Sequence, residues 1–404
     1  MNTVNINMIR EGMTLLQDVC GANGRLLLKS GTTIDSKHIR ILNMWGVTEI
    51  CVAGDSAEDN THDDARPFLP DAEQYVLARF AEKGLEEGPE QELRKLAVLA
   101  AEERLSSGFK APSHGQDTLG SGEIGDSPAF EAILERDPSL ASLPETYLAI
   151  RLALDDPGCT ASRLADIISS DVAMSAKLLK LVNSSALGEN RKIDSLSRGV
   201  IVLGAREVGQ LALSLTVLTK FAGASSCHIS MTDMLKHSVA CGVFAGLLAL
   251  RMNIREFERF FVAGILHDVG RLVLFQCAPE HAAKALFHAN AAKLPLWKAE
   301  RDILGYDHCL IARHLLSRWG IPESLVELVA DHHDPDSESS GAAVINVADA
   351  LAMACEYGGN GLCHFPGLDL QIWGRLALPV SILPVIAQQA RRQLADTLNI
   401  FLEH

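Results

Sequence analysis

Histidine and aspartate residues that could bind a metal ion recur through the C-terminal half of the sequence. They occur in the order His, His-Asp, His, His-His and Asp, as His237, His267-Asp268, His308, His332-His333 and Asp349. Imidazole and carboxylate groups are costly to bury unless they pair with one another or bind a cation. A mixed set of these two ligands suits Fe or Mn, or alternatively Zn, better than Mg or Ca. The residue types therefore predict a site for one or two divalent transition-metal ions.

The spacing of apolar neighbours indicates that two of these histidines face a protein core. Phe260, Gly264 and His267 stand at positions i, i+4 and i+7, which lie on one face of a helix. Leu325 and Leu328 have a similar relation to His332. Each imidazole should point where a core side chain would, so the side chains can converge from separate helices.

The elements that must position these residues are predicted to be helices. From about residue 129 to residue 404, apolar residues recur with the helical period, and Thr160 is a suitable N-cap. The histidine-rich part contains five expected helices, over residues 231–252, 255–267, 308–319, 322–332 and 342–356. The predicted fold class is mainly α, with an all-helical domain over residues 129–404.

A small α+β module is predicted for residues 1–54. The sequence favours strands near both ends of this module, over 4–8 and 47–52, and a hairpin that turns at Asn23-Gly24. Asp35 is expected to cap a helix that runs to Trp45.

Residues 55–128 are predicted to link the two domains. The segment contains two amphipathic stretches, 71–83 and 89–105, which could pack on each other, on the helical domain or on a second subunit. A Gly-, Ser- and Asp-rich stretch over 108–128 is expected to be a flexible linker.

Composition narrows the classes of partner. The net charge of −15 argues against general binding of nucleic acids or anionic membranes, which need a basic surface. A local group of basic residues is expected to be a solvated helix face and loop; it comprises Lys177, Lys180, Arg191 and Lys192.

The nine cysteines contain no CxxC pair, and the first residues show no signal-peptide pattern, so we expect a cytoplasmic protein with reduced thiols. The apolar run over 239–250 is predicted to be a buried helix too short to span a membrane.

The order of the histidines and aspartates resembles that of the HD-domain phosphohydrolase superfamily. His237, His267, Asp268 and Asp349 match its core motif, and the remaining three match the additional ligands of its two-metal members, such as the HD-GYP phosphodiesterases: His308, His332 and His333. The flanking segments resemble instead the HDOD domain, an HD-related output module of bacterial signalling proteins. Its front half resembles Leu143-Pro144-Glu145, Ile167–Asp171 and Leu178–Ser184, and its back half Trp319–Pro322.

The sequence departs from the HD-GYP pattern at positions that bear on activity. Arg271 stands where those enzymes carry a Lys, and Arg can neutralise a phosphate but is not an equivalent proton donor. The Gly-Tyr-Pro loop is replaced by the acidic stretch Asp334–Glu338, which would repel a cyclic dinucleotide, so this ligand is not favoured. Asp233, four residues before His237, could serve a third metal but fits better as an N-terminal helix residue. Three other histidines fit no ligand position and are expected at the surface or an interface: His281, His288 and His314.

The resemblance implies a bacterial signal-transduction protein with a regulatory HDOD domain that binds metal through retained ligands. The alternative is an active phosphohydrolase, in which Asp268 would bridge two metals and Arg271 would hold an oxygen of a phosphate mono- or diester. In a pure binding module the cluster would only fix the shape of the domain or sense a ligand, and a nucleotide-binding regulator is a further possibility. Expected partners are other signalling proteins or a second copy of the chain, but not a membrane.

Overall fold

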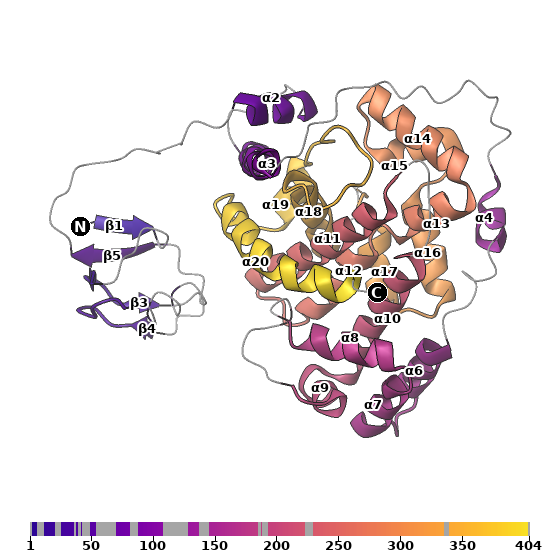
Figure 1. The fold of residues 1–404 in the computed structure, drawn as a ribbon, viewed down its shortest axis with the longest axis horizontal. Coiled ribbons are helices and arrows are strands. Elements are labelled where there is room, and N and C mark those ends of the chain that lie inside the picture. The colour runs from indigo at the N-terminus through magenta and orange to yellow at the C-terminus, as the bar shows by residue number, and fades with distance from the viewer. Residues whose placement is uncertain are drawn as a thin grey trace. The chain divides into compact units, whose positions relative to one another are not determined.

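The computed structural model describes the greater part of the chain. The described residues are 2–5, 12–20, 26–35, 38, 42, 49–53, 70–80, 88–107, 128–136, 145–184, 187, 193–222, 229–334 and 339–402. They form two compact units, residues 1–67 and 68–404 (Figure 1).

The first unit contains short antiparallel strands. β1 (Asn2–Asn5) and β2 (Thr14–Leu15) both pair with β5 (Glu49–Ala53), which gives the strand order β1-β5-β2. β3 (Val19–Cys20) pairs with β4 (Leu26–Leu28), in the segment where a hairpin was expected. The Asn23-Gly24 turn and most of the helix expected up to Trp45 lie outside the described residues, but Asp35 accepts a hydrogen bond of 2.8 Å from the backbone N–H of His38. A small apolar core with Leu15, Ile34 and Val52 holds this unit together.

Every regular element described in the second unit is a helix, as the sequence predicted. The helices are α2 (Pro70–Arg79), α3 (Pro89–Ser106), α4 (Phe130–Arg136), α6 (Glu145–Asp155), α7 (Ala161–Ser169), α8 (Val172–Val182), α9 (Leu196–Leu203), α10 (Ala205–Ala222), α11 (Met231–Arg251), α12 (Phe257–Leu266), α13 (Val269–Cys277), α14 (Pro279–Ala292), α15 (Leu296–Leu304), α16 (His308–Arg318), α17 (Glu323–Ala330), α18 (Ser340–Ala354), α19 (Leu370–Arg375) and α20 (Ile382–Leu402). Thr160 caps α7 by accepting a hydrogen bond from the Arg163 N–H.

Two predicted helix ends move by one or two residues, and the shift matters for the site. α12 ends at Leu266 and α13 begins at Val269, so His267 and Asp268 occupy the break between two helices. α17 ends at Ala330, so His332 and His333 lie in the turn that follows it. A break releases side chains from the strict helical repeat, and consecutive residues can then both face the same cluster.

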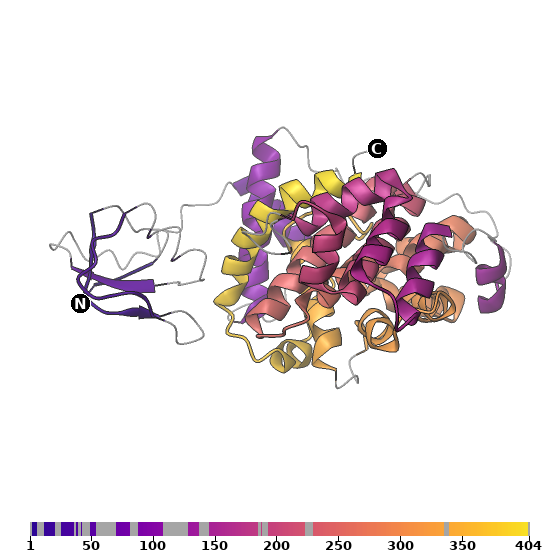
Figure 2. The ribbon, with the colours of Figure 1, turned by 90° about the horizontal axis from the view of Figure 1, so that it is seen from below.

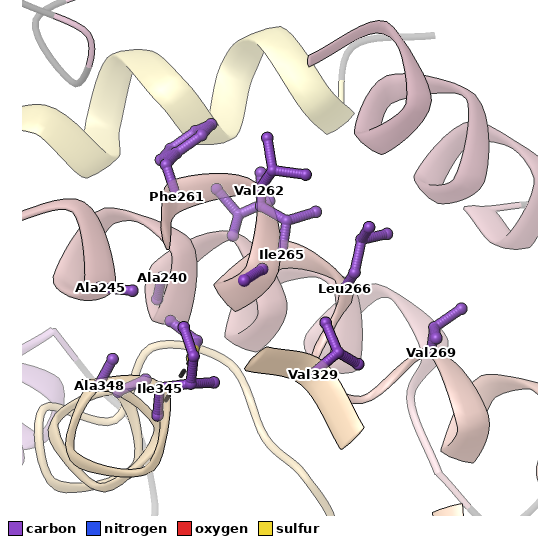
Figure 3. Close-up of a cluster of buried hydrophobic side chains, with 14 of the residues drawn as sticks. Ala240, Ala245, Phe261, Val262, Ile265, Leu266, Val269, Val329, Ile345 and Ala348 are labelled. Atoms are coloured by element: carbon purple, nitrogen blue, oxygen red, sulfur yellow. Dashed lines mark hydrogen bonds between the residues drawn. The ribbon is translucent and has the colours of Figure 1, made fainter. Parts of the chain in front are cut away.

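The pair α11–α12 lies inside the helical unit. α11 packs against α12, α18 and α20, and α12 also contacts α10 and α17 (Figures 1 and 2). Figure 3 shows apolar side chains of this core, with Ala240, Ile265, Val329 and Ile345 gathered around these helices. By length and composition, Met231–Arg251, Phe257–Cys277 and a bent pair from Leu196 to Phe221 could each cross a membrane. In the first two helical segments, 83% and 89% of the apolar stretch is buried inside the protein, so packing in the core explains their high hydropathy.

Helices α2 and α3 from the predicted linker pack on each other and on the helical domain. α3 contacts α18 and α20, and Val76 and Leu93 are part of the same core as the central helices. These contacts show the first two of the three packing alternatives, on each other and on the helical domain.

Glycines allow the backbones of α11 and α12 to touch. A Cβ atom at Gly264 would lie 2.7 Å from the carbonyl oxygen of Cys241 and 2.7 Å from the Cα of Gly242. Backbone atoms cannot rotate away, so this pair of helices can approach closely only without a side chain here. The close approach of α11 and α12 sets the distance between His237 and His267, which lies one turn after Gly264.

We expect Gly264→Ala to force α11 and α12 apart. Overpacking of this kind costs about 1–3 kcal/mol of unfolding free energy, to be measured by urea denaturation of the full chain. Gly246→Ala is the matched control, because its Cβ would meet the nearest atom at an ordinary 3.6 Å. Equal stability of the two variants would contradict the close approach.

Candidate metal centre

Six of the seven residues predicted from the sequence as metal ligands meet in one buried cluster of the helical unit. They come from five different places in the chain: His237 from α11, His267 and Asp268 from the α12–α13 break, His308 from the start of α16, His332 from the turn after α17, and Asp349 from α18. The side chains of His237, His267 and His308 are 1–2% exposed, that of Asp268 is 5% exposed and that of Asp349 14%. The cluster is therefore largely shielded from water, with Asp349 the most accessible of these five.

Hydrogen bonds orient three of the imidazoles in the same way. The Nδ1 atom of His267 lies 2.7 Å from the Gly264 carbonyl oxygen, and that of His332 lies 2.6 Å from the Val329 carbonyl oxygen. The Nδ1 atom of His308 lies 2.5 Å from the Glu300 carboxylate. Carbonyl and carboxylate oxygens accept hydrogen bonds, so each Nδ1 carries the hydrogen and donates it. In the neutral ring the Nε2 atom is then left with a lone pair, the form in which histidine binds metals.

These Nε2 atoms are the unsatisfied groups of the cluster. The Nε2 atoms of His237, His267, His308 and His332 and the Oδ1 atom of Asp349 are buried without a hydrogen-bond partner. His237 Nε2 and Asp349 Oδ1 approach to 2.9 Å but without hydrogen-bond geometry. A buried polar atom without a partner costs about 1–3 kcal/mol, so five in one place call for a shared compensating group.

The distances fit a cation as that group. His237, His267 and Asp349 offer ligand atoms that all lie within 4.8 Å of one another, and so do His267, Asp268 and His332. The Oδ2 atom of Asp268 is 3.5 Å from His267 Nε2, whereas its Oδ1 atom is 3.5 Å from His308 Nε2. Groups of three nitrogen and carboxylate ligands match the preferences of Zn, Fe and Mn. The residues present thus fit a divalent transition metal.

The protonation states of most of these residues also favour a cation. Burial lowers the pKa of His332 to about 3 and, despite the nearby aspartates, lowers that of His267 as well, so both rings are neutral at pH 7. Burial alone would raise the pKa of Asp268, but Arg271 and the histidines outweigh it and hold the pKa well below its usual range. The pKa of Asp349 is lowered against burial by His237 and His267. For His308, burial is outweighed by Glu300, which raises the pKa of the imidazole.

Comparison with known proteins identifies one domain of the chain. The HDOD domain family matches residues 140–335. Residues 140–335 are an HDOD domain. This confirms the resemblance seen in the sequence, and with it the mainly helical fold. Asp349 lies beyond the matched range, although its side chain contacts His237 and His267 within the cluster.

Curated relatives share only parts of their length with this chain. An uncharacterized protein of Treponema pallidum is 27% identical over 208 residues, which are 50% of this chain and 39% of that protein. Ribonuclease Y of Thermus thermophilus is 29% identical over 123 residues, 30% of this chain and 17% of the enzyme. The chain thus spans less than two-fifths of the length of these relatives.

Two solved structures share the fold. An HDOD domain protein of unknown function from Geobacter sulfurreducens is 20% identical, with a TM-score of 0.51 over 77% of this chain and 97% of that one. A protein of Shewanella amazonensis SB2B, named as a candidate phosphohydrolase, is 20% identical, with a TM-score of 0.52 over 67% of this chain and 98% of that one. At this identity the likeness shows the fold alone.

Arg271 of the HDOD domain is buried, and both terminal nitrogens of its guanidinium group donate hydrogen bonds. It is 2% exposed, Nη1 donates a 2.6 Å hydrogen bond to Asp268 Oδ2, and Nη2 donates to the carbonyl oxygen of Asn360. The contact with Asp268 places Arg271 beside the cluster, as the sequence suggested. In this arrangement Arg271 serves as the counter-ion of Asp268.

Glu300 is a functional candidate that the sequence reasoning missed. Its side chain is 4% exposed, and its Oε2 atom accepts hydrogen bonds from both the backbone N–H and the ring of His308. It falls on the apolar face of α15 beside Leu296, Ala299 and Leu304, which are all buried. The same periodicity that singled out His267 would have found it. Cys309, whose sulfur lies 3.7 Å from His332 Nδ1, was also missed.

The other residues singled out from the sequence lie at the edge of the cluster or away from it. His333 is half-buried, with its ring 3.9 Å from that of His332 and stacked at 6.2 Å on Trp297. Asp233 forms an ion pair with Lys236 in the first turn of α11. His288 pairs with Asp302 at the surface, and His314 packs against the ring of Phe130. Residues 335–338 of the acidic stretch lie outside the described part.

Removal of the Asp268 charge should destabilise the metal-free protein. Asp268→Asn leaves the buried Arg271 without its counter-ion, which costs about 3–5 kcal/mol of unfolding free energy. The measurement is denaturant unfolding after chelator treatment. The control Asp302→Asn removes a carboxylate that is 57% exposed and should change stability by less than about 0.5 kcal/mol. A loss below about 1 kcal/mol in Asp268→Asn would refute the assigned ion pair.

Proposed function

We propose that this chain is a signal-transduction protein whose HDOD domain holds a divalent transition-metal ion in the His/Asp cluster. The observation that supports this most directly is the set of four buried Nε2 atoms without partners. Three of these rings are held by Nδ1 hydrogen bonds, an arrangement typical of metal-binding histidines. A polar network that only filled space would have these atoms paired with one another.

The ligand atoms suggest room for one or two ions. His237, His267 and Asp349 would hold one, and His308 and His332 would face a second, with Asp268 between them. Fe and Mn are the proposed metals, with Zn as the alternative, on the basis of the mixed nitrogen and oxygen donors. A bound ion of this kind would supply Lewis-acid chemistry towards a phosphate oxygen or a water molecule. Glu300 would hold the His308 ring in the required tautomer.

The first test is metal binding by the full chain. We expect the wild type to take up Co²⁺, followed by visible absorption after chelator treatment, and to contain Fe, Mn or Zn by elemental analysis as purified. Glu300→Gln should weaken Co²⁺ binding about 10–100-fold, because it removes the carboxylate that orients His308. Glu323→Gln, at a side chain that is 65% exposed, is the matched control and should bind as the wild type does. A folded wild type without affinity for these ions would refute the metal centre.

A second candidate function is metal-dependent hydrolysis of a phosphate mono- or diester. The observation in its favour is the position of Asp268, whose two oxygens each lie 3.5 Å from a different histidine, as expected of a carboxylate that would serve two ions. Arg271 lies next to it and could neutralise a phosphate oxygen, provided that it exchanges one of its present partners for the substrate. The regulatory module is the simpler proposal, because it needs no such exchange.

Turnover assays with generic substrates separate the two functions. An active enzyme should hydrolyse p-nitrophenyl phosphate or its bis ester when loaded with Mn²⁺ or Fe²⁺, and Asp268→Ala should abolish the reaction. Asp302→Ala, outside the cluster, should retain the wild-type rate. A metal-loaded wild type with no turnover above buffer on any phosphate ester tested would leave the regulatory function and exclude the hydrolase for those substrates.

A further inference from the structure

The loop after α18, residues 356–368, touches both the metal cluster and the helices α2 and α3. We refer to it as the strap. We propose that Glu356, the first residue of the strap, is a positioning residue that couples α2 and α3 to the metal centre. This inference rests on the metal-binding function proposed above. It is carried by contacts at the two ends and in the middle of the strap.

At its start the strap is held by a buried carboxylate. The Glu356 side chain is 2% exposed and faces two arginines from two helices. Arg79 of α2 donates to Oε1, and Arg104 of α3 donates to Oε2 at 2.7 Å. Arg79 also lies 3.3 Å from the hydroxyl of Tyr75. A buried carboxylate between two guanidinium groups has a fixed position.

At its far end the strap is bound to the same two helices. The Phe365 ring stacks on Phe80 at 4.5 Å, and its backbone N–H donates a 2.8 Å hydrogen bond to the Arg79 carbonyl oxygen. The backbone N–H of Leu368 donates a 2.9 Å hydrogen bond to Glu90 of α3. Both ends of the strap are therefore fixed to α2 and α3.

The middle of the strap touches two parts of the metal centre. Gly358 lies so close to α11 that a Cβ there would be 2.7 Å from the backbone nitrogen of His237. The neighbouring Gly359 N–H donates a 3.1 Å hydrogen bond to the Asp233 carbonyl oxygen. The carbonyl oxygen of Asn360 accepts from Arg271, which in turn donates to Asp268.

A continuous path of charged and backbone contacts thus leads from α2 and α3 to Asp268. If the strap shifts, the Asn360 carbonyl moves away from Arg271, and Arg271 then holds Asp268 differently. Thermodynamic coupling is reciprocal, so metal binding should in turn tighten the packing of α2 and α3.

The test compares Co²⁺ binding and amide hydrogen exchange in full-length variants. Glu356→Gln keeps the shape of the side chain but removes its charge. We expect it to weaken Co²⁺ binding about 5–150-fold, the range of typical coupling energies. In the wild type Co²⁺ should slow exchange in residues 70–80 and 88–107, and this effect should be lost in Glu356→Gln. Glu256→Gln is the matched control, since the Glu256 side chain is 64% exposed and pairs with Arg259 at the start of α12.

The outcomes are distinguishable. If the wild type binds Co²⁺ and Glu356→Gln binds it equally well, with the same protection of α2 and α3, the coupling is overturned although the metal centre stands, even where the variant melts earlier. If the wild type binds no Co²⁺, both proposals fall. Should Glu356→Gln not fold, Arg104→Gln serves instead, because it leaves Arg79 on the carboxylate and should give the same two changes to a smaller extent.

Discussion

The burial of imidazole nitrogens that have lone pairs but no partners is the constraint on which this structure depends. The interior of an all-helical core satisfies its own backbone, so a polar side chain within it must find a partner at a helix end, in another side chain or in an ion. Here the Nδ1 atoms of His267, His308 and His332 find such partners, whereas their Nε2 atoms do not. In each of these rings the hydrogen bond at Nδ1 directs the Nε2 atom into the cluster, towards the other rings. One or two divalent cations are the simplest groups that compensate these atoms.

The helices can present these rings together because they break or touch at particular points. The break between α12 and α13 places His267 and Asp268 side by side, which one continuous helix could not do, since consecutive residues point about 100° apart. Gly270 performs a similar function for α16, because a Cβ there would lie 2.0 Å from the carbonyl oxygen of His308. The break between α12 and α13, together with a glycine at position 270, brings α12, α13 and α16 to a common centre.

The sequence predicted what depends on local periodicity and failed where contacts are long-range. The helices and the inward face of His267 follow from apolar spacing over a few turns, and the family resemblance supplied the order of the ligands. Glu300 lies on an apolar stripe and was within reach of the same reasoning. The contact of Asn360 with Arg271 joins residues 89 positions apart through a backbone carbonyl, and no side-chain pattern encodes it. The pairing of Glu356 with Arg79 spans 277 positions and likewise appears only in the folded chain.

Arg271 gives the cluster a property that a Lys at this position would not. A guanidinium can bind two acceptors at fixed angles, whereas an ammonium acts as a point charge. Arg271 uses this geometry to join Asp268 of the cluster to the strap at Asn360. Asp268 therefore has a counter-ion before any metal arrives, and a cation must share the carboxylate with Arg271. Sharing of the carboxylate lowers the affinity for the metal. It also makes that affinity depend on the strap and, through Glu356, on α2 and α3. A regulatory domain gains from this dependence, whereas a hydrolase would need Arg271 free for its substrate.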